Sequence, residues 1–266
     1  MKNLQEHQVF KWVHPKPGTF VYDTNWAWKA KADEKGFISR AKARLVARGF
    51  RQRYARDYLD VMAPVGKLTS FRALLAEAAH LDFEWGALDV RSAYLKADLD
   101  IKQYVKPPDG VEPPEPGMVM MLERGLYGTA QGARCFHLKF RRELLSWGFQ
   151  ASVADPCLFV KRDEDGEEVL RVLLFVDDLC VLNARTAAGR ALKVELKKNI
   201  EKLYEYSVDD AENMYIGMQV ETLERERRRA LFLHQVAYIT KFMTKHGMMD
   251  RDGKQVCHAT YTPAPV

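Results

Sequence analysis

The sequence predicts an ordered domain that combines β-hairpins with amphipathic helices, as one large unit or two small units sharing a core. Three observations support this. The chain has 266 residues, which is long enough to bury a sizeable core. Its content of 47% hydrophobic and 11% aromatic residues excludes a disordered polyanion and a fibrous repeat. Segments with the two-residue period of strands alternate with segments at helical spacing, with no internal repeat or low-complexity tract.

Positive charge is concentrated towards the N-terminal end of the sequence. The chain carries 41 Lys and Arg against 36 Asp and Glu, a net charge of only +5. The stretch 29–56, however, contains ten basic side chains and two acidic ones, so the remainder is faintly acidic. A basic block on such a body favours a partner that carries phosphate groups.

Several classes of protein are excluded by the sequence. The opening residues, MKNLQEHQVF, lack the apolar segment of a secretory signal. The most apolar run, VLLFV at 172–176, is far shorter than the ~20 residues that a membrane span needs. The four cysteines form no CxxC pair, which predicts free thiols in a reducing compartment rather than disulfides or a zinc site. We therefore expect an intracellular protein without membrane contact.

Residues 20–46 predict a basic β-hairpin. WAWKAKAD alternates aromatic residues or alanine with lysine, Glu34-Lys35-Gly36 supplies a turn, and FISRAKARLVARGF returns with the same alternation. Each strand therefore places its cations on one face. Such a face is usually only solvated, but the number of cations here favours contact with phosphates.

A helix is predicted next, and a strand follows it. Thr69 or Ser70 is expected to cap a helix that ends near Leu81. WGALDV at 85–90 then predicts a short buried strand, with SAYLKADL after it. The apolar face of the helix consists of Phe71, Leu74, Leu75 and Ala78.

A proline-rich loop and a second helix occupy the middle of the chain. Residues 106–117 hold five of the 11 prolines and predict an extended connection. GLYGTAQGAR at 125–134 opens a helix that is expected to run to Trp147 and to stop at Gly148. Its apolar face consists of Phe136, Phe140, Leu144 and Leu145.

The C-terminal half alternates hairpins and helices. Residues 157–182 predict the clearest hairpin, whose second strand runs into Asp177-Asp178 at a tight turn before LCVLN. An amphipathic helix at 187–206 follows, and a second hairpin at 214–235 surrounds the charged turn LERERRR. A short helix at 236–249 ends the ordered part, and the tail from Asp250 is expected to be loose.

Two carboxylate positions stand at the ends of apolar strands. Asp89 follows Ala87-Leu88, and alone it would most simply be a turn former. Asp177 and Asp178 are different, because neighbouring carboxylates at a buried hairpin tip repel each other and a divalent cation offsets that repulsion. A third carboxylate from a neighbouring strand would complete an oxygen site for Mg²⁺. Pairs of such ions, roughly 3.5–4 Å apart, promote in-line attack on phosphates.

The order of these elements resembles the reverse transcriptase domain of copia-type LTR retrotransposons, from about Trp12 to Pro263. No single segment decides the resemblance, but eight segments occur in the family's order and spacing. They are WAWKAKADEKGFISRAKARLVARGFRQ, DYLDVMAPV, LDVRSAYLKADLDIKQYVKPPDG, LYGTAQGARCF, GFQASVADPCLFV, LLFVDDLCVL, YIGMQVE and LHQVAYITKFMTKHGM.

The resemblance implies an α+β fold of the right-hand polymerase type, with a palm sheet backed by helices. It assigns residues 1–66 and 97–135 to the fingers and residues 67–96 and 136–221 to the palm. Residues 222–266 would form a partial thumb or connection, and the whole chain would be one reverse transcriptase domain.

The catalytic residues implied by the resemblance are Asp89, Asp177 and Asp178. Asp89 and Asp177 would bind two Mg²⁺ ions, for which Mn²⁺ is a possible substitute, and the carbonyl of Val90 would help to hold one of them. Asp178 is the more peripheral carboxylate.

The resemblance also implies residues for the substrates. Tyr94 falls where related polymerases keep an aromatic gate against the ribose 2′-hydroxyl, although a core tyrosine is the alternative. Lys42 and Arg44 would bind the triphosphate, and Gln131 and Arg134 would contact the incoming nucleotide and the template. The residues implied at the primer and template are Phe175, Val176, Tyr215, Ile216, Gly217, Arg48, Arg51 and Arg53.

The sequence departs from the family pattern at the catalytic turn, where Phe175 replaces the usual tyrosine, and beside Gln131, where Ala130 and Gly132 replace lysine and proline. The implied partners are an RNA or DNA template with its primer, dNTPs, and a ribonuclease H domain in the parent polyprotein. The implied location is the cytoplasm, in a virus-like particle, or the nucleus. The alternatives to an active polymerase are an inactive remnant that binds only nucleic acid or a partner, and a subdomain inactive without ribonuclease H.

Overall fold

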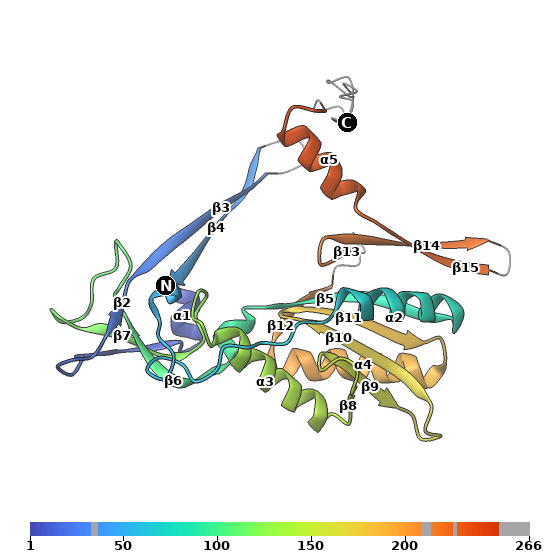
Figure 1. Ribbon diagram of the computed structural model, residues 1–266, viewed down its shortest axis with the longest axis horizontal. Helices are drawn as coiled ribbons and strands as arrows, with labels where there is room; N and C mark the ends of the chain where they lie inside the picture. Colours follow the sequence, from blue (N-terminus) through green and yellow to red (C-terminus); the bar gives the residue numbers. More distant parts are fainter. Residues whose placement is uncertain (33–36, 209–213, 226–227, 250–266) are drawn as a thin grey trace, which may run out of the picture.

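The structure is a computed structural model, and it describes residues 1–32, 37–208, 214–225 and 228–249. It has a mixed α and β architecture with several separate sheets. Figure 1 shows the largest sheet at the lower right, a smaller sheet at the left, and a long hairpin that rises from the smaller sheet.

The central sheet has six strands in the order β12-β5-β11-β10-β9-β8, and all neighbouring strands are antiparallel. Helices α3 and α4 cover one face of this sheet, and α2 covers the other (Figure 1). The strands are β5 (Phe83–Arg91), β8 (Gln150–Ala151), β9 (Leu158–Arg162), β10 (Glu168–Phe175), β11 (Asp178–Ala184) and β12 (Glu205–Val208). The helices are α2 (Leu68–His80), α3 (Gly132–Ser146) and α4 (Ala187–Leu203).

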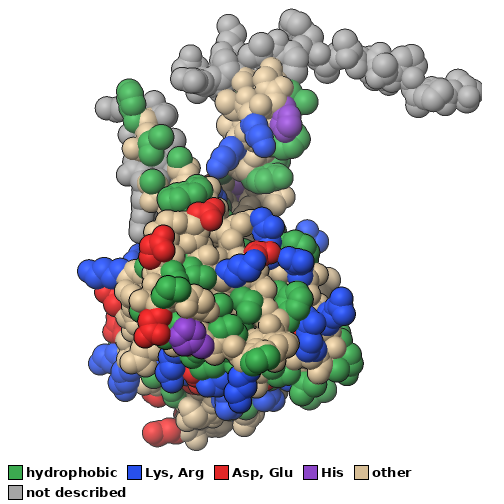
Figure 2. Space-filling model, turned by 90° about the vertical axis from the view of Figure 1, so that its left-hand side faces the viewer, with side chains coloured by type: hydrophobic (Ala, Val, Ile, Leu, Met, Phe, Trp, Pro, Cys, Tyr) green, Lys and Arg blue, Asp and Glu red, His purple; other side chains and the backbone are tan. Residues whose placement is uncertain are grey.

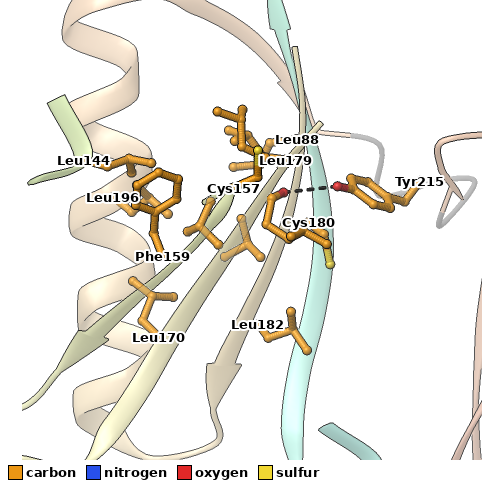
Figure 3. Close-up of a cluster of buried hydrophobic side chains, with 14 of the residues drawn as sticks. Leu88, Leu144, Cys157, Phe159, Leu170, Leu179, Cys180, Leu182, Leu196 and Tyr215 are labelled. Atoms are coloured by element: carbon orange, nitrogen blue, oxygen red, sulfur yellow. Dashed lines mark hydrogen bonds between the residues drawn. The ribbon is translucent and has the colours of Figure 1, made fainter. Parts of the chain in front are cut away.

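The main hydrophobic core lies on both faces of this sheet. Strand β10 is buried from Val169 to Leu174, and all of these residues are apolar except Arg171. Because helices lie on both faces of the sheet, side chains of β10 are buried whichever way they point. Figure 3 shows Phe159, Leu170 and Leu196 gathered towards one face, and Cys180 and Tyr215 towards the other. The Tyr215 hydroxyl donates a hydrogen bond of 3.2 Å to the backbone carbonyl of Leu173, which satisfies this buried polar group.

A second, smaller core belongs to the four-stranded sheet in the order β1-β7-β6-β2. Helix α1 packs beside it, and the long β3–β4 hairpin is joined to it at its base. The bounds are α1 (Lys2–Glu6), β1 (Phe10–Val13), β2 (Val21–Tyr22), β3 (Thr24–Ala32), β4 (Ile38–Ala47), β6 (Asp98–Val105) and β7 (Val119–Arg124). Two short 3₁₀ turns, η1 (Gly49–Arg51) and η2 (Ala93–Lys96), follow β4 and β5.

The C-terminal elements form a third part. Strands β13 (Met214–Tyr215), β14 (Met218–Arg225) and β15 (Arg228–His234) make a three-stranded sheet, and α5 (Val236–Lys245) follows them. Helix α5 buries none of its side chains fully, whereas β13 is anchored on the core through Tyr215, whose ring contacts that of Phe71.

Most expected elements are present, and the loop at 106–117 is confirmed between β6 and β7. The basic hairpin is confirmed as β3–β4, but its expected turn at 34–36 lies outside the described residues. The expected loose tail also lies outside them. Most of the expected charged turn LERERRR belongs to strands instead, because β14 extends to Arg225 and β15 begins at Arg228, and residues 226–227 lie outside the described residues.

Three local expectations were wrong. Neither Thr69 nor Ser70 caps α2, because the carboxylate of Asp155 accepts the Lys67 backbone N–H and the Ser70 hydroxyl instead. The helix expected at 187–206 ends at Leu203, where the chain turns into the edge strand β12. Leu145 is 37% exposed, since it lies beside the buried stripe of α3.

The cysteines behave as expected where they are described. Cys135, Cys157 and Cys180 are buried free thiols, and burial raises the pKa of Cys157 to about 12. Cys257 lies outside the described residues. None of the helices in the described ranges is both long and apolar enough to span a membrane.

Candidate active site

The predicted catalytic carboxylates lie on neighbouring strands of the central sheet. Strand β11 pairs with β5, and Asp178 stands directly opposite Asp89 in the register. Residues opposite each other in an antiparallel pair point to the same face, so these two carboxylates share the face that α2 covers further along.

Asp177 occupies the turn that joins β10 to β11. Phe175 pairs with Asp178, which leaves Val176 and Asp177 as the two residues of the turn. Val176 adopts a left-handed backbone with φ of 57°, an uncommon and strained conformation for a β-branched residue. The carbonyl of Asp177 accepts a hydrogen bond of 2.9 Å from the Val90 backbone N–H, which ties the turn to the residue after Asp89.

The charges of Asp89 and of the basic hairpin both act on Asp177. Burial raises the pKa of the Asp177 carboxyl, and the charge of Asp89 raises it further. Arg44 and Lys42 act on this pKa in the opposite direction, so the positive charge of β4 reaches the carboxylate. The described structure therefore brings carboxylates from the central sheet and cations from the hairpin into one region.

The donor atoms in this region are of the kind that bind a hard divalent ion. Among the described residues, no three His, Cys, Asp or Glu side chains are already arranged as a metal site. The charge of Asp89 nevertheless makes ionisation of the Asp177 carboxyl more costly, which contributes to the raised pKa of Asp177. A divalent cation coordinated by their oxygens would remove that cost, and oxygen ligands are those that Mg²⁺ prefers. The residues present thus fit such an ion.

Tyr94 lies on the η2 turn just after β5, and it is half-buried rather than a core residue. Burial raises the pKa of the Tyr94 hydroxyl, and the charge of Asp177 raises it further, so the two side chains interact electrostatically. Its ring also contacts that of Tyr127, with centroids 5.1 Å apart. Gly132 permits this packing, because a Cβ there would lie 3.0 Å from Cδ1 of Tyr94.

Lys42 and Arg44 project from the same face of the hairpin. Arg44 stands opposite Ala27 and Lys42 opposite Lys29, so the cations share one face of β3–β4 and Trp26 and Trp28 share the other. Lys29 and Lys42 are like charges directly opposite each other, and such pairs are destabilising. An anion bound on this face would offset their repulsion. Figure 2, which shows the side of the four-stranded sheet, has Lys and Arg spread among acidic and apolar side chains without one continuous basic patch.

Gln131 and Arg134, predicted to contact the nucleotide, are both held by partners within the protein. The buried amide of Gln131 donates to the Ile101 carbonyl at 2.6 Å, and the guanidinium of Arg134 forms ion pairs with Asp60 and Asp100. The structure therefore places both side chains at the junction of α3 with β6 and the loop around residue 60.

The residues predicted to bind primer and template lie in two separate places. Tyr215, in β13, is buried against the central core, while Ile216 and Gly217 form a turn in left-handed conformations. Phe175 and Val176 lie at the catalytic turn. The three arginines follow the end of β4. Arg48 donates a hydrogen bond to Asn25, Arg51 forms an ion pair with Asp23, and Arg53 is exposed.

Sequence reasoning missed Tyr127. Its ring contacts Tyr94, and the Arg44 guanidinium lies 5.0 Å from its centroid. The available signal was its place in the LYG segment that carries the resemblance, but nothing in the local pattern reveals contacts with residues 33 and 83 positions away.

Comparison with known proteins identifies the family of the chain. Residues 7–260 match the family described as "Reverse transcriptase (RNA-dependent DNA polymerase)". Since the match covers nearly the whole sequence, the chain belongs to this reverse transcriptase family.

Curated relatives from plants share the whole region. The chain is 32% identical over 250 residues to the "Retrovirus-related Pol polyprotein from transposon TNT 1-94" of Nicotiana tabacum, which covers 93% of this chain. It is 30% identical to the "Retrovirus-related Pol polyprotein" from transposons RE2 and RE1 of Arabidopsis thaliana, over 88% and 89% of this chain. The matched region spans only 16–18% of these relatives' own lengths.

Proposed function

We propose that this chain is the RNA-directed DNA polymerase region of a copia-type retrotransposon Pol polyprotein. The observation that carries the proposal is the placement of Asp89 opposite Asp178, with Asp177 in the adjoining turn and the β4 cations acting on it. The family and the plant Pol polyproteins to which the chain is similar support the same reading.

In this proposal the chain folds as a right-hand polymerase. Residues 67–96 and 136–221 correspond to the palm, which contains the central sheet with α2, α3 and α4. Residues 1–66 and 97–135 correspond to the fingers, with the β3–β4 hairpin reaching over the site. Residues 222–266 correspond to a partial thumb or connection.

The proposed reaction is transfer of a nucleotide from a dNTP to a primer 3′-hydroxyl. Two Mg²⁺ ions, for which Mn²⁺ can substitute, would supply a lower pKa for that hydroxyl and neutralise the triphosphate and the leaving pyrophosphate. Asp89 and Asp177 would hold them, with Asp178 at the periphery and the Val90 carbonyl assisting. The protein contributes position and charge rather than a covalent nucleophile.

The remaining side chains bind and orient the substrates in this proposal. Lys42 and Arg44 hold the triphosphate, and Tyr94 excludes a ribose 2′-hydroxyl. Gln131 and Arg134 support the nucleotide and template side of the pocket from the positions described above. The Tyr215-Ile216-Gly217 turn seats the primer end, and Arg48, Arg51 and Arg53 contact the template.

The proposed partners are an RNA or DNA template with its primer, and a ribonuclease H domain in the parent polyprotein. The proposed location is the cytoplasm, within a virus-like particle, or the nucleus.

The test is extension of a DNA primer on an RNA template by residues 1–266, with Mg²⁺, with Mn²⁺ and with neither. Asp177→Asn is the matched control, because it keeps the size of the side chain and removes its charge. We expect extension that requires the metal and is lost in the variant. A chain that binds the duplex in a gel-shift assay but never extends it, even with a ribonuclease H domain supplied, would identify an inactive remnant and overturn the proposal.

A further inference from the structure

Tyr127 connects two groups that come from distant parts of the sequence. Its ring contacts the Tyr94 ring on η2, with centroids 5.1 Å apart and planes at 48°. The Arg44 guanidinium of β4 lies 5.0 Å from the centroid of the same Tyr127 ring, within the range of a cation–π contact. One aromatic side chain therefore touches both the candidate gate for the sugar and a candidate ligand of the triphosphate.

The backbone around Tyr127 is fixed to the base of the hairpin. Its carbonyl accepts a hydrogen bond of 2.8 Å from the Ala47 backbone N–H, and Tyr127 forms an isolated parallel bridge with Val46. Gly128 allows this approach, since a Cβ there would come within 2.2 Å of the Ala47 carbonyl oxygen. The loop is thus in direct contact with the end of β4, two or three residues beyond Arg44.

The residues that follow Tyr127 in this loop are also held by hydrogen bonds. The backbone N–H of Ala130 donates to the buried side-chain carbonyl of Gln52 at 2.7 Å, and the Thr129 hydroxyl donates to the Leu126 carbonyl. These bonds fix the backbone of the loop that carries the Tyr127 ring.

We propose that Tyr127 is a positioning residue that couples the triphosphate contact of Arg44 to the sugar selectivity of Tyr94. The inference rests on the proposed polymerase function and extends it to a residue outside the assumed substrate contacts. Removing the ring would leave Arg44 without its flat support and Tyr94 without its neighbour, so both substrate contacts would loosen together.

The charge state of the ring is consistent with this role. Burial raises the pKa of the Tyr127 hydroxyl, the charges of Asp177 and Asp89 raise it further, and Arg44 opposes them. The hydroxyl therefore stays protonated at neutral pH, and Arg44 contacts a neutral aromatic face.

The experiment compares Tyr127→Leu with Tyr127→Phe in the full chain. Tyr127→Phe keeps the ring and both of its contacts, whereas Tyr127→Leu keeps bulk and removes the aromatic face. For each variant, primer extension gives KM and kcat for a dNTP and the deoxy/ribo ratio of incorporation. A second readout needs no turnover: retention of a chain-terminated primer–template against competitor duplex, as the dNTP concentration is raised.

We expect Tyr127→Leu to raise the dNTP KM by about 3- to 30-fold, the range that one cation–π contact corresponds to. The deoxy/ribo ratio should fall in parallel, while binding of the primer–template without dNTP stays within about twofold. Tyr127→Phe should match the wild type. Tyr127→Leu should also be non-additive with Arg44→Ala in KM and with Tyr94→Ala in the ratio, because the partners share one contact.

Three outcomes would overturn the inference. The first is a lower melting temperature of Tyr127→Leu with unchanged KM and ratio, which would make the ring merely structural. The second is full additivity in both double variants. The third is a change in KM or in the ratio alone, because the proposal requires the two to move together. A wild-type chain that neither extends nor retains primer–template in response to dNTP would overturn the polymerase proposal and this inference together, whereas wild-type activity with any of the three outcomes overturns only the inference.

Discussion

The carboxylate end of the central sheet and the β3–β4 hairpin supply the opposite charges of the candidate site, yet they are built very differently. Asp89 and Asp178 are flanked along their strands by fully buried residues such as Val90 and Leu179. The hairpin buries Leu45 and Ala47 near its base, whereas Trp28 and Ile38 further along are 73% and 71% exposed. The carboxylates are therefore positioned by the core, whereas the cations stand on a hairpin of which much of the described part is exposed.

Because of this difference, substitutions in the two regions should have different kinetic effects. Groups fixed in a packed sheet keep their geometry without substrate, as stabilisation of a charged transition state requires. Groups on an extended hairpin adjust when substrate arrives, so their loss should show in substrate affinity and much less in the chemical step. Substitutions in the two regions should accordingly separate kcat from KM.

The largest expected effect is that of Asp177→Asn on the chemical step. Losing the charge of a carboxylate that we propose to bind the metal should lower kcat by at least about 10³-fold, as expected where several kcal/mol of charge stabilisation are lost. Steady-state extension assays at saturating dNTP measure this. A matched substitution on the hairpin, Arg44→Ala, should change kcat far less, and equal losses of kcat in both variants would remove the distinction between the two regions.

The stability of Asp177→Asn relative to the wild type is also expected to depend on pH. Burial and Asp89 raise the pKa of Asp177 in the folded chain above its value in the unfolded chain. The stability linked to this group is thus fully present below about pH 4 and is lost as the pH rises through the raised pKa. Asp177→Asn should therefore unfold at a higher temperature than the wild type at pH 7 with metal chelated, and the two should converge near pH 4. Parallel melting curves from pH 4 to 8 would contradict this.

The next effect concerns the scaffold under the carboxylates. Asp155 is buried at the start of α2, where it accepts hydrogen bonds from the Lys67 and Cys157 backbone N–H groups and from the Ser70 hydroxyl. Burial alone would raise the pKa of Asp155, but these bonds outweigh it and hold the pKa below its usual value. Asp155→Ala should cost about 3 kcal/mol, because buried donors lose a charged acceptor.

Urea unfolding of Asp155→Ala beside Ser70→Ala provides the control. Ser70→Ala removes one donor and should cost only about 1 kcal/mol. Since the pKa of Asp155 is lowered, its contribution should be present at neutral pH and disappear as the pH falls through that lowered pKa. Equal and small losses from both substitutions would show that α2 does not depend on this cap.

The third effect belongs to Tyr94, at the boundary between the two regions. Tyr94→Ala removes a ring beside Asp177 without removing a metal-binding group. We expect the preference for deoxynucleotides over ribonucleotides to fall by about 10- to 200-fold, the range expected for one excluded group in a pocket. Because the ring is half-buried, the loss of stability should be nearer 1–2 kcal/mol than the 3–5 kcal/mol of a core aromatic. A large drop in melting temperature with an unchanged ratio would identify Tyr94 as structural.

The difference between local patterns and contacts remote in the sequence explains how much of the molecule the sequence could predict. The apolar periods of β5, β10 and α2 depend on local patterning, so the strands and the Asp89 and Asp177-Asp178 positions could be predicted from the sequence. The cap of α2 could not, because Asp155 lies 85 residues from Ser70 along the chain. The partners of Arg134 are equally remote, at Asp60 and Asp100. Contacts that the tertiary fold brings together leave no periodic signal in the sequence.

The smallest expected effects are differences between substitutions of individual cations in and beside the hairpin. Lys42 and Arg44 act on Asp177, whereas Arg51, beyond the end of β4, forms an ion pair of 2.9 Å with Asp23. Lys42→Ala and Arg44→Ala should therefore each raise the dNTP KM by about tenfold, as for one lost charge-assisted contact. Arg51→Ala should leave that KM unchanged and weaken template binding slightly. Arg53→Ala, which removes an exposed side chain, should also leave that KM unchanged and is the comparison for template binding.

The salt dependence of template binding sharpens this last comparison. Each phosphate contact that is lost lowers the log–log slope of affinity against salt concentration by roughly one. We expect that change for Arg53→Ala and a smaller one for Arg51→Ala, because Asp23 already neutralises much of the Arg51 charge in the free protein. Lys42→Ala and Arg44→Ala should leave the slope unchanged, since the anion we propose for them is the nucleotide and not the template backbone. Small and equal changes in KM and slope for all four substitutions would mean that the cations only solvate the hairpin, and the hairpin would then have no part in the site.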